Sequence, residues 1–158
     1  MSLLAVFDWL QYSSPLVAMR SSAWLFPAIA SVHLLGLAML GGAVLVVDLR
    51  LLGLGLTRPP VADVGRDAQP WLVASLCVMV PTGLLLFMCF ATKYYYLTAF
   101  WIKVGAVLLA LAFTFSVRRR VLLAADGAVI AFKRKLVGAI SLSLWATIAL
   151  AGRLIGFP

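Results

Sequence analysis

Four long apolar runs divide the sequence, and charged or turn-forming residues stand between them. The runs cover approximately residues 24–47, 71–91, 97–117 and 136–155. A helix needs roughly 20 apolar residues to cross a bilayer, so each run is long enough for one span. We therefore predict an all-α fold, with a four-transmembrane-helix bundle as the domain over residues 23–158.

Residues 1–22 form a separate N-terminal segment with no run long enough to span. Four of its apolar side chains share one helical face, namely Leu3, Leu4, Phe7 and Leu10. Asp8 and Gln11 lie off that face. This pattern predicts an interfacial amphipathic helix lying on the membrane. Pro15 should begin a second short helical turn.

The segments between the runs carry the residues that interrupt helices. Glycine and proline are frequent over residues 51–70, which predicts an irregular connector. Residues 121–132 are mildly amphipathic and are expected to lie on the membrane surface. Pro81 falls in the middle of the second run and should bend that helix.

The composition agrees with a membrane protein. Hydrophobic residues make up 65% of the chain and charged residues 11%, against roughly 25% charged in soluble domains. The formal net charge is +8, which by itself raises nucleic acid as a partner. The basic residues fall in short segments between apolar runs, however, so we expect the bilayer and no nucleic acid.

The distribution of Lys and Arg predicts the orientation of the chain. Three basic residues follow the first span and six lie between the third and fourth spans: Arg50, Arg58, Arg66, Arg118, Arg119, Arg120, Lys133, Arg134 and Lys135. The other side has Arg20, Lys93 and Arg153. We therefore expect both termini outside, in the periplasm, and the basic loops in the cytoplasm, in a bacterial inner membrane.

Polar residues at membrane depth are costly and often functional. His33, the single histidine, lies about 13 Å inside the first span. It is a candidate metal and cofactor ligand, or else a residue that hydrogen-bonds a neighbouring helix. Lys103 and Arg153 either extend to the headgroups or pair with a carboxylate near His33. Asp48 is expected to be interfacial and to pair locally with Arg50.

Several catalytic motifs are absent from the sequence. It has no CxxCH, HExxH, Walker loop or GxGxxG, and it contains no Glu. No acid pair is available for proton relay, and no spacing joins a nucleophile to His33. We expect no catalytic residues, and the chain is not expected to be an enzyme by itself.

The stretch from Trp24 to Gly42, which contains His33, Gly36 and Gly41, is followed by Val47-Asp48-Leu-Arg50-Leu-Leu-Gly53. It resembles an uncharacterised bacterial family of small four-helix integral membrane proteins. The spacing His-x-x-Gly with a following Gly-Gly is also similar to helices of b-type cytochromes and of copper-resistance membrane proteins. Those groups generally offer several intramembrane histidines, whereas this chain has one, so ligation by two histidines of one chain is out of reach.

Two hypotheses follow for the function. The first is a small b-type cytochrome-like subunit that binds haem b through His33 and passes electrons near the outer face, with Lys103 and Arg153 near the propionates. Its second axial ligand would be Met88, an open site, or His33 of a second copy. The second is a non-catalytic accessory subunit of a larger membrane complex, with His33 in packing. An oligomeric carrier or channel is a third possibility. Partners would be other membrane subunits or a homo-oligomer.

Overall fold

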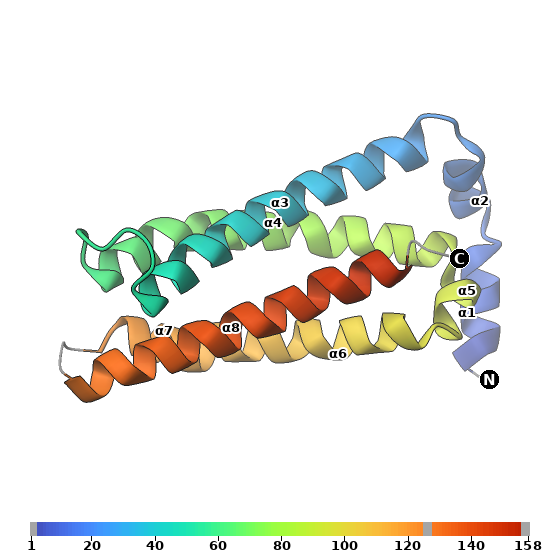
Figure 1. Cartoon of the computed structure of the whole chain (residues 1–158). Helices are drawn as coiled ribbons and strands as arrows, with labels where there is room; N and C mark the ends of the chain where they lie inside the picture. Colours follow the sequence, from blue (N-terminus) through green and yellow to red (C-terminus); the bar gives the residue numbers. More distant parts are fainter. Residues whose placement is uncertain (1–2, 125–127, 156–158) are drawn as a thin grey trace.

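The computed structural model describes residues 3–124 and 128–155, and over these residues the chain is helical and contains no strand (Figure 1). Four helices are long and apolar enough to cross a membrane. They are α3 (Leu25–Leu52), α4 (Val61–Cys89), the continuous α6, η1 and α7 (Thr98–Phe113, Thr114–Arg118, Arg119–Leu122), and α8 (Ala128–Ile155). The predicted all-α, four-span fold is confirmed.

These helices run further than the predicted spans. At about 1.5 Å per residue the 28 residues of α3 reach about 42 Å, beyond the ~30 Å of hydrocarbon. The predicted connector over residues 51–70 is therefore too long, because α4 begins at Val61 and continues through Pro70. The prediction of a surface segment over residues 121–132 is also wrong, because the third helix extends to Leu122 and α8 begins at Ala128. Residues 125–127 lie outside the described residues.

The four long helices form two layers, with α3 and α4 in one and α6 and α8 in the other (Figure 1). The closest backbone neighbours are α3 with α4, α6 with α8, and α3 with α8. Among the described residues, α4 and α6 are not such a pair, although α4 contacts α7 at one end of the same side. We call the end with the α3–α4 and α7–α8 connections the basic end, and the other the N-terminal end.

Glycine allows the closest approach between α3 and α8. A Cβ added at Gly138 would lie 3.0 Å from Leu51 Cβ and 3.1 Å from the Asp48 carbonyl oxygen. Gly138→Ala should therefore destabilise the protein by about 1–3 kcal/mol, since backbone and side chain must both shift. The matched control is Gly105→Ala, where nothing lies within 4 Å. Unfolding titrations in mixed micelles measure the difference, and equal stability of the two variants would contradict this packing.

The N-terminal segment packs on the bundle as α1 (Leu3–Gln11) and α2 (Ser14–Ser21), and Pro15 lies in the first turn of α2. The polar face of α1 contacts α5 (Ala91–Tyr95), where the Thr92 hydroxyl donates to Asp8 Oδ1 at 2.9 Å. Thr92 N–H donates to Gln11 Oε1 at 3.0 Å. Arg20 donates to the Cys89 carbonyl oxygen at 3.0 Å, at the C-terminus of α4. The segment thus caps this end of the bundle.

Aromatic rings fill the space between α4, α5 and α6 at the same end. The Phe87 ring stacks on Phe100 with centroids 4.9 Å apart, and Tyr94 stacks on Phe100 at 5.7 Å. Burial raises the pKa of the Tyr94 phenol, and the neighbouring Cys89 thiol adds to that rise. The Tyr94 side chain therefore stays neutral and serves as packing between the two layers.

Candidate functional site

His33 faces α4 from the middle of the N-terminal half of α3. Its Nδ1 lies 2.9 Å from Thr82 Oγ1. The Thr82 hydroxyl also lies 2.7 Å from the Val78 carbonyl oxygen, to which it donates. A hydroxyl has one hydrogen, so Thr82 acts as the acceptor toward His33. Nδ1 then carries the imidazole proton, and Nε2 presents a lone pair.

A glycine on α4 makes room for the imidazole ring. A Cβ added at Gly83 would lie 3.1 Å from His33 Cε1, so any larger residue would displace the ring. Neither Thr82 nor Gly83 was identified from the sequence. The available signal was a polar and a small residue directly after Pro81 in the second span. The helix is continuous through Pro81, and the bend predicted there stays a prediction.

Lys103, on α6, lies at about the same level along the bundle as His33. It interacts electrostatically with His33, and its Nζ would lie 3.4 Å from a Cβ on Gly152 of α8. The structure therefore puts Lys103 within electrostatic range of His33. The third predicted site residue, Arg153, directly follows Gly152, and its side chain is exposed.

Met88 does not lie beside His33, contrary to the depth expected from span counting. It packs with Leu16, Met19 and Cys89 at the N-terminal end. Six residues separate it from Thr82, which is about 9 Å along α4. Met79 is one turn from Gly83, and its Cγ would lie 3.0 Å from a Cβ on Gly36. The methionine at the level of His33 is therefore Met79.

The bundle is less tightly packed at the level of His33 than at the levels on either side of it. Five polar and small residues at this level are partly exposed: His33, Thr82, Gly83, Lys103 and Gly152. Toward the basic end, Leu40 and Val44 are 1% and 2% exposed. Toward the N-terminal end, Cys89 is fully buried. The bundle is thus tightly packed above and below the imidazole and looser at its level.

A second polar cluster lies at the basic end, and there the expectation for Asp48 is wrong. Asp48 is fully buried, and its Oδ1 lies 3.0 Å from Nε of Arg118, which is 3% exposed. Arg118 Nη2 also donates to the Val44 carbonyl oxygen at 3.3 Å. Arg50 instead donates to the Pro59 carbonyl oxygen. Asp48 therefore pairs across the bundle, because the rotation of α3 turns it inward.

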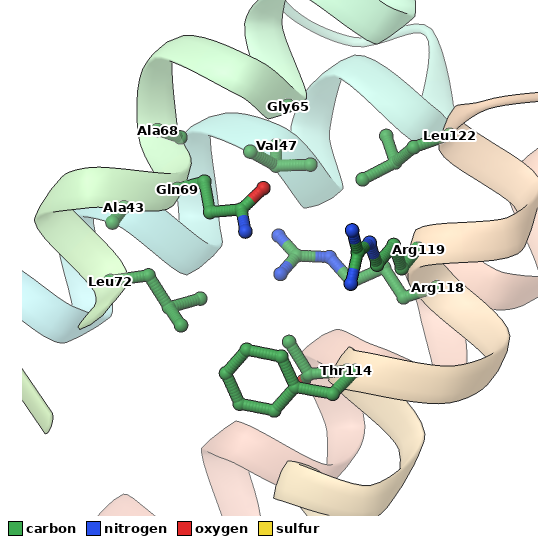
Figure 2. A pocket seen from close by; sticks show the side chains of 11 residues that line it. Ala43, Val47, Gly65, Ala68, Gln69, Leu72, Thr114, Arg118, Arg119 and Leu122 are labelled. Atoms are coloured by element: carbon green, nitrogen blue, oxygen red, sulfur yellow. The ribbon is translucent and has the colours of Figure 1, made fainter.

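A wide turn of the third helix presents Arg118 to this cluster. Residues Thr114–Arg118 form one π-helical turn, a distortion often found at functional sites. Beside it lies a cavity of about 40 Å³ between α3, α4 and the third helix. Figure 2 shows the Gln69 amide and the guanidinium groups of Arg118 and Arg119 directed into this space. Sequence reasoning missed the cluster, because Arg118 resembled the other two arginines that end the span.

Among the described residues, no group of three or more His, Cys, Asp and Glu side chains lies close enough to hold a metal ion. Residues 15–158 match the model of a family of unknown function (DUF6644). No curated protein sequence and no solved structure matches the chain.

Proposed function

Since the chain belongs to the family of unknown function DUF6644, we propose its function from the geometry of its own site. We propose that it is a small b-type cytochrome-like membrane subunit. His33 would bind haem b, and electrons would pass near the N-terminal end of the bundle.

The single observation that carries this proposal is the contact of His33 Nδ1 with Thr82. Histidines that ligate a metal usually donate their other ring N–H to a fixed acceptor, which sets the tautomer and orients the ring. Thr82 supplies that acceptor because its own hydrogen is directed at the Val78 carbonyl oxygen. Nε2 would then be the ring nitrogen available to ligate the haem iron.

The surroundings of His33 fit the same group. The residues at the level of His33 are partly exposed, between two tightly packed levels of the bundle, and this leaves the imidazole accessible. Lys103 places a cation between α6 and α8, within electrostatic range of His33, where it would pair with a propionate. Arg153 follows Gly152 and would add a second cation at the rim. Haem, when bound, supplies one-electron redox chemistry, while the protein holds and orients it.

The test is an absorbance spectrum of the protein purified from haem-replete cells, with the haem content measured as its pyridine complex. A Soret band with sharp reduced α and β bands is expected, at one haem per chain or one per two chains. One haem per two chains would mean that His33 of a second copy is the other axial ligand. A colourless protein that also fails to bind added haem would overturn the proposal.

From the distribution of Lys and Arg along the sequence, we propose that the basic end faces the cytoplasm of a bacterial inner membrane. Single cysteines at Thr57 and Lys93, in a background without Cys77 and Cys89, would report each end. Impermeant maleimide added to intact cells should label Lys93→Cys and leave Thr57→Cys unlabelled until the cells are opened. The reverse labelling pattern would mean that the orientation is opposite to the proposed one and that His33 lies nearer the cytoplasm.

A second candidate is a non-catalytic accessory subunit in which His33 only holds α3 against α4. The exposed glycines of α3 favour it, because a Cβ on Gly41 or Gly42 would meet nothing within 4 Å. Such small residues allow a partner helix to approach closely. Under this candidate the protein is colourless, and Gly41→Leu should release the co-purified subunit. The matched control is Gly105→Leu on α6, which is equally open.

A further inference from the structure

The helical Ser and Thr residues reveal a second site that the haem proposal does not use. A hydroxyl in a membrane helix commonly donates to the carbonyl four residues earlier. Six residues of the long helices do so: Ser31, Ser75, Thr82, Ser116, Ser143 and Thr147. In the described part of the chain, the buried oxygens of Thr114 and Ser141 lack a regular hydrogen bond. Both lie in the Asp48–Arg118 cluster.

The two hydroxyls face different directions. Ser141 interacts with the Asp48 carboxylate, although without regular hydrogen-bond geometry. Thr114 is 6% exposed and lines the cavity beside Arg118. A buried hydroxyl without a partner costs about 1–3 kcal/mol. The Thr114 hydroxyl therefore needs a group inside the cavity to accept or donate its hydrogen bond.

The residues around the cavity select for an anion. Two arginines and one amide line it, and no acidic residue does: the polar members are Gln69, Thr114, Arg118 and Arg119 (Figure 2). Asp48 lies behind Arg118 and neutralises that charge, while Arg119 is exposed and supplies a further positive charge. Arginine, amide and hydroxyl groups together are the usual donors to phosphate oxygens.

The position of the cavity indicates where that anion comes from. It lies between α4 and the third helix, and Gln69 and Arg119, which line it, are exposed, so it can be reached laterally from the lipid. Arg118 and Arg119 lie near the end of the third candidate span, Thr98–Leu122, and an arginine at the end of a span extends to the lipid headgroups. A volume of about 40 Å³ is a few times the ~10–15 Å³ needed to hold one water, so it admits a few phosphate oxygens while the acyl chains remain outside.

We propose that this cavity binds the phosphate group of an anionic phospholipid from the leaflet at the basic end. Arg119 and Gln69 hold the phosphate at the mouth, and the Thr114 hydroxyl donates to an inner oxygen. The π-helical turn begins at Thr114, whose buried hydroxyl has no hydrogen-bond partner among the described residues. The Asp48–Arg118 pair forms the inner wall.

The test uses the full chain in nanodiscs of phosphatidylcholine with 10 mol% phosphatidylglycerol. The protein is extracted in mild detergent, and the phosphatidylglycerol that it retains is quantified by mass spectrometry. Thr114→Val removes the hydroxyl without changing shape or charge, and it should lower retention about fivefold. Arg119→Gln should lower retention by a similar factor. The controls are Thr147→Val, whose hydroxyl donates to Ser143, and Arg120→Gln, which does not line the cavity.

Each outcome decides the proposal. Retention that falls in both cavity variants and stays within twofold in both controls supports the site. Equal losses in Arg119→Gln and Arg120→Gln, with none in Thr114→Val, would mean diffuse attraction to an anionic surface and would overturn it. In phosphatidylcholine alone, 10 mM inorganic phosphate should not stabilise the protein. Stabilisation by phosphate that Thr114→Val abolishes would instead assign the cavity to a free anion and overturn the lipid as its source.

Discussion

Asp48→Asn is expected to lower the free energy of unfolding by about 3–5 kcal/mol, because it leaves the buried Arg118 guanidinium without a counter-charge. The carboxamide keeps the shape of the carboxylate, so the loss reports charge and not volume. An unfolding titration in mixed micelles, followed by circular dichroism, measures it. A loss below 1 kcal/mol would mean that Arg118 reaches water or headgroups and that the pair is not closed.

The control for Asp48→Asn is an ion pair on the surface of the same protein. Arg66 and Asp63 lie 3.6 Å apart with side chains 78% and 50% exposed. Exposed pairs contribute little, so Arg66→Gln should change stability by less than about 0.5 kcal/mol. The difference between the two variants isolates the effect of burial.

Removing both charges separates pairing from the need for polar groups. Buried ion pairs can often be replaced by apolar residues of similar volume at little cost. The double variant Asp48→Leu with Arg118→Met should therefore be more stable than Asp48→Asn by at least about 2 kcal/mol. A double variant as unstable as the single one would show that the Val44 carbonyl or Ser141 also depends on these side chains.

His33→Ala is expected to abolish the Soret band while the protein still inserts and folds, because it removes the imidazole ligand of the proposed haem. Lys103→Ala and Arg153→Ala should keep the haem and shift its reduction potential, since each removes a positive charge near the propionates. If His33 only packs, His33→Ala should cost about 1–2 kcal/mol of stability and change no spectrum. Absorbance and unfolding measured on the same preparations distinguish the two.

Thr82→Val is the finer test of the same site, because it removes the acceptor of the Nδ1 proton and leaves the ligand in place. Loss of such a supporting hydrogen bond typically weakens metal binding 10–100-fold. Haem should therefore be retained weakly and lost on dilution. The matched control is Thr147→Val on α8, far from the imidazole in the sequence and bonded only to its own helix. Equal haem affinity in both variants would mean that Thr82 does not position the ring.

The sequence by itself determined the number of spans, the helical class and the separate N-terminal segment. These depend on local composition: a run of about 20 apolar residues must satisfy its backbone hydrogen bonds within one helix, whatever surrounds it. The same reasoning singled out His33 and Lys103, because polar residues in an apolar run are visible without a structure. It made the helices too short at the basic end, because charged residues such as Lys133 and Arg134 belong to a helix that extends beyond the hydrocarbon.

Only the tertiary structure decided which polar side chains meet. Asp48 and Arg118 are separated by 70 positions, and each looked interfacial because it lies at the end of an apolar run. Whether such a residue turns inward depends on the rotation of its helix and on the neighbour that packs there, and α3 and α8 approach through Gly138. Thr82 and the π-helical turn at Thr114 were hidden for the same reason. Their roles arise from contacts between helices, and a local pattern along one helix does not contain them.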